Sequence, residues 1–425
     1  MAAVFLACLL RPAPAAADDE YDKPPISYSQ TDAVNTVSRL VDRLKSGTGR
    51  LQFHADYGYL PSLLDELQIP VSSQMLVFSK TSLQRHRISP RTPRALYFND
   101  DVYVGYCQNG EVLEISAADP HLGAVFYTLS QEEAAVPQIV RQSDNCMICH
   151  ASSQLKQVPG HLVRSVFVDH GGLPVLSAGS HRITQSSPLE DRWGGWYVTG
   201  THGAQRHLGN LVLPGGQQQI VPHNVDNSAG MNLAALGDRF DSSAYLTGHS
   251  DIVALMVLEH QTEGHNLIAR AGYATRQALH YQETLNRELG EPAGHVWDST
   301  RTRIKNAGDA LVEYLLFCGE TPLTHRIEGT SGFAADFAKP GPRDSRNRSL
   351  RDFDLERRMF KHPCSYLVDS PCFQALPVEV LEHVLGRLRE VLGGRDQSKP
   401  FAHLTPADRQ AVLEILRETH PAWKL

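Results

Sequence analysis

The pentapeptide Cys-Met-Ile-Cys-His at positions 146 to 150 carries side chains whose types and spacing suit covalent chemistry with a porphyrin. Two thiols three residues apart reach the two vinyl groups on one edge of a haem, and the imidazole after the second thiol then lies under the iron. Cys146 and Cys149 are therefore predicted to attach one haem c, with His150 as the proximal iron ligand. The pattern is rare by chance, because the chain has 7 cysteines in 425 residues.

Two other interpretations of these cysteines are weaker. A zinc site needs a second pair of ligands at finger spacing, and Cys364 with Cys372 are too widely spaced to supply one. A dithiol redox centre also uses two cysteines separated by two residues. It occurs where strands and helices alternate, and the flanking sequence does not predict that arrangement.

Whether a protein side chain binds the second face of the haem iron distinguishes an electron carrier from an enzyme. A Met or His there closes the site, whereas an open face admits peroxide or another small ligand. One stripe of a predicted helix carries His249, Val253, Met256 and His260. Met256 or His260 is therefore the predicted distal ligand, although a Met on an apolar stripe is more often part of the core. Met231 is a looser candidate.

A turn punctuated by glycines, with the sequence TGTHGAQRHLGN, contains His202, Arg206 and His207. A general base and a cation beside a haem face are what cleavage of a peroxide O–O bond requires, so these three residues are weak candidates for catalysis. The alternative is an ordinary hairpin loop with hydrogen-bonded histidines.

The remaining carboxylates and histidines of this region are predicted to be structural. Glu259 and Glu263 lie one helical turn apart, but no second helix carries the Glu-x-x-His pattern of a di-metal site, so a solvated face is expected. His161, His170 and His181 lie near turns and are expected at the surface.

The elements that position these residues change in character along the chain. Short segments rich in β-branched and aromatic residues predict strands at MLVFS, RALYFN, DVYVGYC, EVLEIS and AVFYTL, and again after the motif at HLVRSVFVD, LPVLSA and GGWYVTG. Helical periodicity predicts helices over residues 31–45, 251–260, 277–289, 304–318, 350–360, 377–392 and 405–419. We expect an α+β fold with three parts, which are an N-terminal arm and helix (18–70), a β-rich haem module (71–225) and a mainly helical region (226–425).

The composition narrows the possible partners. Hydrophobic residues make up 41% of the chain and charged residues 20%, as in ordinary globular proteins. The net charge of -7 gives a nucleic acid no electrostatic support, but it suits a basic redox partner protein. No segment approaches the roughly twenty apolar residues of a membrane span.

Residues 1–17 are predicted to be a signal peptide, because an apolar run precedes the small residues 15–17. The basic segment that normally comes first is missing, which is consistent either with a truncated signal peptide or with a chance match. Export to the periplasm would allow two disulfides among Cys107, Cys318, Cys364 and Cys372, with three possible pairings. Cys318 is equally consistent with a buried free thiol.

The motif and the leader together resemble those of c-type cytochromes. The whole chain, including PRALYFNDDVYVGY, RWGGWYVTGTHG and DIVALMVLEHQ, is similar to a group of bacterial proteins that contain a cytochrome c domain. The resemblance implies haem attachment by thioethers after translocation, through Cys146, Cys149 and His150. Small cytochromes c are wholly helical and provide a Met ligand within several dozen residues, whereas here the flanks predict strands and the first Met after His150 is Met231.

One-electron transfer with a redox partner protein is the leading prediction for function. A haem-dependent oxidoreductase of peroxidase type, with an open distal face, is the first alternative. A haem-containing sensing or interaction module is the second.

Overall fold

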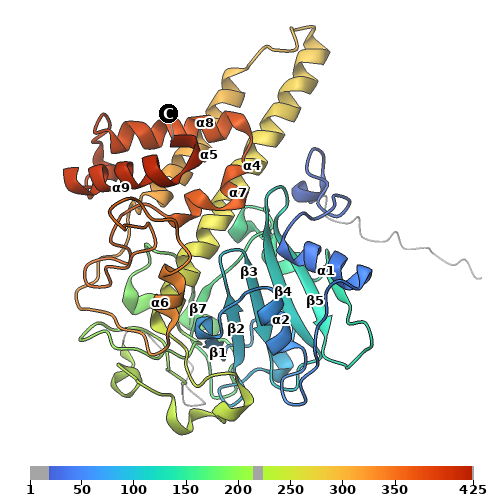
Figure 1. The fold of residues 1–425 in the computed structure, drawn as a ribbon, viewed down its shortest axis with the longest axis vertical. Helices are drawn as coiled ribbons and strands as arrows, with labels where there is room; N and C mark the ends of the chain where they lie inside the picture. The colour runs from blue at the N-terminus through green and yellow to red at the C-terminus, as the bar shows by residue number, and fades with distance from the viewer. Residues whose placement is uncertain (1–18, 214–223, 424–425) are drawn as a thin grey trace, which may run out of the picture.

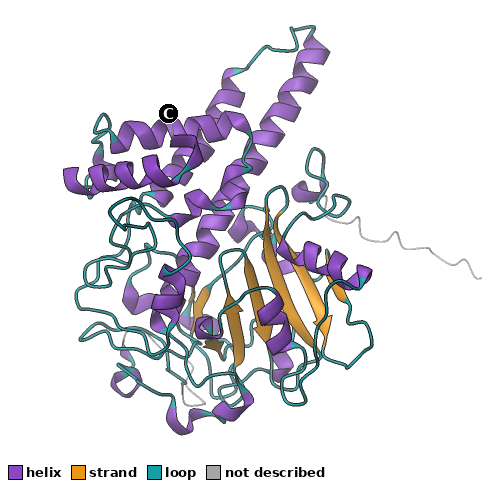
Figure 2. Ribbon diagram, viewed as in Figure 1, coloured by secondary structure: helices purple, strands orange, loops and turns teal. Residues whose placement is uncertain are grey.

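A computed structural model of the chain describes residues 19–213 and 224–423, so the expected signal peptide lies outside the described residues. Figures 1 and 2 show an antiparallel sheet formed by the first half of the chain and a set of helices formed mainly by the second half. The strands are β1 (Met75–Val77), β2 (Arg94–Phe98), β3 (Val102–Tyr106), β4 (Val112–Asp119), β5 (Gly123–Ser130), β6 (Ile139–Gln142), β7 (Arg164–Val166) and β8 (Ser180–Arg182). The α-helices are α1 (Thr36–Ser46), α2 (Leu60–Glu66), α3 (Met147–His150), α4 (Ile252–Leu289), α5 (Asp298–Leu315), α6 (Phe333–Ala338), α7 (Pro371–Gln374), α8 (Val378–Leu392) and α9 (Pro406–Thr419). The predicted α+β class is confirmed.

The main sheet is a meander in which β1 to β6 pair in sequence order, each antiparallel to its neighbour. The five strands predicted before the motif are all present. β4 and β5 are the longest strands, and they pair from Val112 with Ser130 to Asp119 with Gly123. Gly123 closes this hairpin with a φ of +74°, a conformation that residues with a Cβ rarely adopt.

The two faces of the sheet are covered by different helices. The outer face, which includes Tyr97, Val104 and Ile115, packs with residues of α1 and α2 in one hydrophobic core. The inner face, which includes Phe98, Tyr103 and Ala118, packs against α4 in a second core. That second core continues into α5, α8 and α9. It therefore contains residues from both sides of the boundary that the sequence predicted between residues 225 and 226.

Helix α4 is one continuous helix of 38 residues, whereas the sequence predicted two separate helices over 251–260 and 277–289. The Asp251 side chain caps it by accepting hydrogen bonds from the backbone of Val253 and Ala254, and Gly290 ends it in a left-handed conformation. The two predicted helices are joined because the polar residues between them are buried by polar partners rather than left in solvent. With α5, α4 forms a hairpin that projects beyond the rest of the molecule (Figure 1).

Three other segments differ from the prediction. Residues 350–360 form no helix, because the Asp354 side chain accepts hydrogen bonds from the backbone of Glu356 and Arg357 and turns the chain. The LPVLSA segment contains a 3₁₀ turn, and the GGWYVTG segment makes single bridges, such as the one between Trp196 and Val77, instead of a strand. The helix predicted over 405–419 is α9, and Thr405 and Asp408 form a capping box at its start. Within the described residues, each helix is either too short or too polar to cross a bilayer.

Candidate haem-binding site

The predicted haem motif forms a single helical turn, α3, directly after the edge strand β6. Cys146 begins the turn, and its carbonyl accepts a hydrogen bond from the His150 backbone at 3.0 Å. Met147 is buried and anchors the turn to the core, whereas Cys149 is exposed and Ile148 is 77% exposed. Both cysteines are free thiols. The turn therefore directs one thiol and an apolar side chain outward, as attachment of a bulky apolar group requires.

One ring nitrogen of His150 is hydrogen-bonded to the backbone, and the other has no hydrogen-bond partner among the described residues. Its Nδ1 lies 2.9 Å from the Gly160 carbonyl, which can only accept, so Nδ1 carries the proton. Gly160 donates its own backbone N–H to the His150 carbonyl at 2.9 Å, and the imidazole packs on Phe126 with ring centroids 4.5 Å apart. Nε2 has no hydrogen-bond partner among the described residues. Burial lowers the pKa of His150, so the ring is neutral near pH 7, which is the form that binds a metal.

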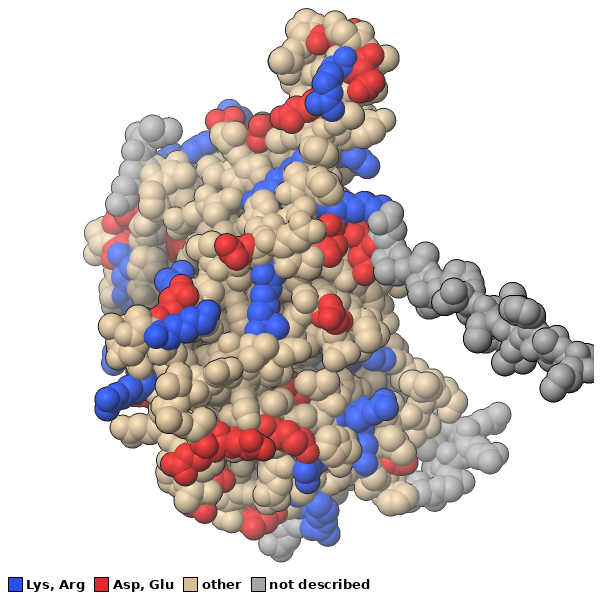
Figure 3. Space-filling view, turned by 90° about the vertical axis from the view of Figure 1, so that its right-hand side faces the viewer, with Lys and Arg blue, Asp and Glu red and all other residues tan. Residues whose placement is uncertain are grey.

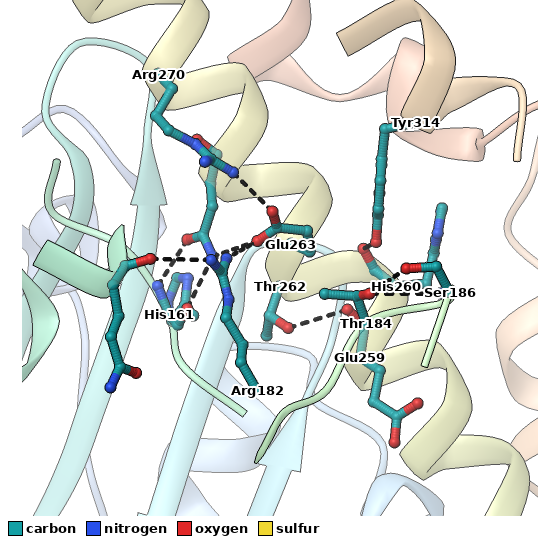
Figure 4. Close-up of polar contacts among 12 residues, drawn as sticks. His161, Arg182, Thr184, Ser186, Glu259, His260, Thr262, Glu263, Arg270 and Tyr314 are labelled. Atoms are coloured by element: carbon teal, nitrogen blue, oxygen red, sulfur yellow. Dashed lines mark hydrogen bonds and ion pairs between the residues drawn. The ribbon is translucent and has the colours of Figure 1, made fainter. Parts of the chain in front are cut away.

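The loop between His150 and His161 is attached to α4 by side-chain hydrogen bonds. Asn266 accepts a hydrogen bond from the His161 backbone N–H and donates one to the His161 carbonyl, each at 2.8 Å. Asn266 also donates to Glu263, which is paired with Arg270 and with Arg182. Figure 4 shows Glu263 between these two arginines. Arg182 in turn donates to the backbone of Gln154, inside the loop, so three hydrogen bonds hold the backbone that follows His150.

His161 itself is buried, and the expectation that it lies at the surface is wrong. Its Nε2 lies 3.0 Å from the Ser116 hydroxyl, and its ring packs on Tyr103. Tyr103 also contacts His265 Nδ1 at 3.1 Å. His161 Nδ1 and His265 Nε2 have no partner, and both residues line a cavity of about 10 Å³. A cavity of that size with two polar groups has room for about one water molecule.

The residues around the motif fit a haem better than the two other interpretations. No group of three or more His, Cys, Asp or Glu residues suited to a metal ion occurs in the part of the chain that the structure describes. Burial raises the pKa of Cys146 to about 11, whereas a redox-active dithiol needs a lowered thiol pKa. A helical turn with two free thiols and an imidazole with a free Nε2 matches what attachment and ligation of haem c require.

The structure does not bring Met256 and His260 together with His150. The 150–161 loop contacts α4 at Asn266, and Met256 lies ten residues, or about 15 Å, before that point along the helix axis. Met256 is buried beside Leu189, Leu323 and Met359.

Both ring nitrogens of His260 are already hydrogen-bonded, Nδ1 to Gln185 at 2.6 Å and Nε2 to Ser365 at 2.7 Å. Its ring stacks on Tyr314 and Phe317. Met231 lines a surface recess beside the 203–206 turn. None of these placements supports the predicted distal ligation.

The weak catalytic candidates also make their contacts away from the motif. His202 and His207 are buried with their rings 4.7 Å apart, and His207 packs on Trp193. His202 Nε2 accepts a hydrogen bond from the Asn232 backbone at 3.2 Å, which leaves it a structural role. Arg206 is exposed. Within residues 19–213 and 224–423, none of the hydrogen bonds or ring contacts of this turn involves His150.

The other sequence expectations have mixed outcomes. Glu259 and Glu263 do not form a solvated face, because Glu259 is fully buried against Arg192 and Trp193 and Glu263 is buried in the cluster of Figure 4. Asn266, His161 and His265 are functional candidates that sequence reasoning missed. For Asn266 and His265, the available signal was the unbroken polar run at 259–266 directly after the apolar residues 252–258.

Among the described residues, the four cysteines outside the motif form no disulfides. Cys107, Cys364 and Cys372 are buried free thiols, and Cys318 is a partly buried one. Burial raises the pKa of Cys107 and Cys318 to about 12, so neither thiol is activated.

Comparison of the chain with family models, with curated proteins and with solved structures gave no match. The interpretation of the site therefore depends on the chemistry of its own residues.

Proposed function

We propose that this protein carries one covalently attached haem c and acts in one-electron transfer in the periplasm. Cys146 and Cys149 would hold the haem through thioether links, and His150 would bind the iron through Nε2. The bound iron would supply a centre that gains and loses one electron.

The hydrogen bond from His150 Nδ1 to the Gly160 carbonyl is the observation that carries this proposal. It selects the tautomer in which Nε2 has a free lone pair, and it fixes the plane of the ring. The ring is therefore held in one orientation while its Nε2 has no hydrogen-bond partner among the described residues. The exposed Ile148 and Cys149 beside it would be covered by a porphyrin.

Electron transfer is favoured over peroxide chemistry because the residues expected to cleave an O–O bond have other contacts. His202 is held by Asn232 and packs on His207, and Arg206 is exposed. On the face of the molecule in Figure 3, basic and acidic side chains are mixed, and a band of acidic side chains crosses the lower half. With the net charge of -7, this supports a basic redox partner.

Haem attachment is tested by producing the chain in a bacterial host with an active cytochrome c maturation system. We expect a coloured protein that keeps its haem after denaturation and has the mass of the chain plus one haem. Cys146→Ala with Cys149→Ala should abolish attachment, whereas Cys318→Ser, which changes a partly buried thiol elsewhere, should retain it. A colourless wild-type protein from a host that matures a reference cytochrome would refute the proposal.

The role of the haem is tested by absorption spectra of the purified protein in both redox states. Six-coordinate, low-spin bands in both states, with slow or absent cyanide binding, are the result expected for a carrier, and the sixth ligand would then be a residue other than Met231, Met256 and His260. A high-spin ferric form that binds cyanide rapidly would instead support the oxidoreductase alternative. His260→Gln should leave the spectrum unchanged, because both of its ring nitrogens have partners in the protein.

A further inference from the structure

The inner face of the main sheet is only partly covered. At one end α4 and the 150–161 loop bury Phe98, Tyr103 and Ala118. At the other end most of the inward side chains are partly exposed, although they belong to the same face. Strand pairing places Leu96, Gly105, Glu114, Thr128 and Val140 in one row across β2 to β6. Leu96, Glu114 and Thr128 are partly exposed, and Val140 is 49% exposed.

An ion pair crosses this open row. Arg94 reaches over Gly105, where any Cβ would meet the guanidinium, and binds Glu114 at 2.7 Å. The two side chains are 18% and 15% exposed, and the Arg94 Nε is buried without a partner. Ser82 and Gln84 bind the other oxygen of Glu114, so the carboxylate is fixed in place.

The haem motif lies beside this row. His150 packs on Phe126, which belongs to the adjacent row of the same face, two residues from Thr128 on β5. The charges of the ion pair act on the motif in opposite directions. Burial has the largest effect on the pKa of Cys146 and raises it, Glu114 raises it further, and Arg94 lowers it.

We propose that the haem attached at Cys146 and Cys149 lies on this uncovered part of the sheet, the haem bed (Arg94, Leu96, Glu114, Thr128 and Val140), and that Arg94 and Glu114 set its reduction potential. The proposal rests on the proposed function. Leu96, Val140 and the exposed Ile148 give the porphyrin apolar contacts that are otherwise left in water. The opposite charges of Arg94 and Glu114 compensate each other, so an apolar ring can cover them without leaving one charge unpaired.

Each charge of the pair has a predictable effect on the potential. A negative charge near the iron favours the ferric state, and a positive charge favours the ferrous state. Glu114→Gln should therefore raise the reduction potential, and Arg94→Gln should lower it. A purely structural role for the pair would not produce shifts of opposite sign.

The experiment is a potentiometric titration of the haem protein and its variants. The ion pair between Arg358 and Asp408, in the helical region, provides matched controls. The Arg358 side chain is 20% exposed and the Asp408 side chain is 14% exposed, close to the values for Arg94 and Glu114. Arg358→Gln and Asp408→Asn should leave the potential unchanged. Because changes to Arg94 can impair folding, a second set uses the exposed Val140, where Val140→Lys should raise the potential and Val140→Glu should lower it. Val378, which is 58% exposed on α8, is the control position for the same two substitutions.

The outcomes separate this proposal from the proposed function. Potential shifts of opposite sign at Arg94 and Glu114, or at Val140 with Lys and Glu, support the haem bed. Shifts of the same sign, or shifts no larger than those of the controls, would overturn the haem bed and leave covalent haem binding intact. A wild-type chain without haem would overturn both.

Discussion

Asn266 is expected to be the residue on which the order of the 150–161 loop depends most strongly. Its side chain pairs both backbone groups of His161 and donates a third hydrogen bond to Glu263 at 3.0 Å. It is 4% exposed, so water cannot readily replace it. Asn266→Ala removes all three bonds and leaves the His161 N–H and carbonyl buried without partners. At about 1 kcal/mol per neutral hydrogen bond, the free energy of unfolding should fall by about 3 kcal/mol.

Two measurements test this expectation. Urea denaturation gives the change in the free energy of unfolding, and amide hydrogen exchange reports on the 150–161 loop. If the loop opens locally, a loss of about 3 kcal/mol corresponds to an increase in exchange of up to about 100-fold.

Asn286 provides a control on the same helix. It is 2% exposed, and it accepts a hydrogen bond from Trp297 and donates one to the His295 carbonyl. Asn286→Ala should also destabilise the chain but leave exchange in the 150–161 loop unchanged. The reasoning fails if Asn266→Ala costs less than about 1 kcal/mol and exchange in the loop stays at the wild-type rate.

Two further expectations concern pH and backbone conformation. Burial lowers the pKa of His265 from its ordinary 6.5 to about 4, so the unfolded chain takes up this proton first and stability should fall as the pH drops from about 6.5 to about 4. His265→Gln should make that fall shallower, by up to about 1.4 kcal/mol per pH unit, in denaturation curves collected across this range. Gly123→Ala should cost at least about 2 kcal/mol in the same assay, because its φ is +74° and its Cβ would lie 2.6 Å from the Pro159 carbonyl oxygen. Gly290→Ala, with φ +68° and nothing within 4 Å, should cost only about 1 kcal/mol, and equal losses at the two positions would contradict the steric argument.

The sequence predicted elements well where local chemistry determines them. The segments predicted as strands between Met75 and Ser130 are rich in β-branched and aromatic residues and are bounded by turn residues. All five are strands in the structure. The cap at Thr405 was also predictable, because a capping box involves residues only three positions apart. In the same way, the thiols and imidazole of the motif are close together in any helical turn, so their grouping needed no tertiary information.

The parts that could not be predicted depend on partners distant in the chain. The polar run 259–266 is expected in solvent from its composition, yet its partners come from remote segments, such as Arg192 for Glu259 and Tyr103 for Gln261. No periodicity argument identifies such partners. Because these partners are distant in the chain, the sequence wrongly predicted two helices over residues 251–289 and a surface position for His161.

The buried polar residues of α4 give a physical reason for combining a sheet with a long helix around one short motif. An isolated helical turn such as α3 cannot hold a histidine in one orientation, since four residues are too few to form a stable helix alone. The ring is instead fixed through Gly160, and the loop that contains Gly160 is fixed by Asn266 and Glu263. Glu263 is held by two arginines, one on α4 and one on β8, so a shift of the ring would disturb hydrogen bonds in three separate elements. A histidine held in this way would change position little when the charge of a bound metal changes, which is the property that the proposed one-electron transfer would require of its site.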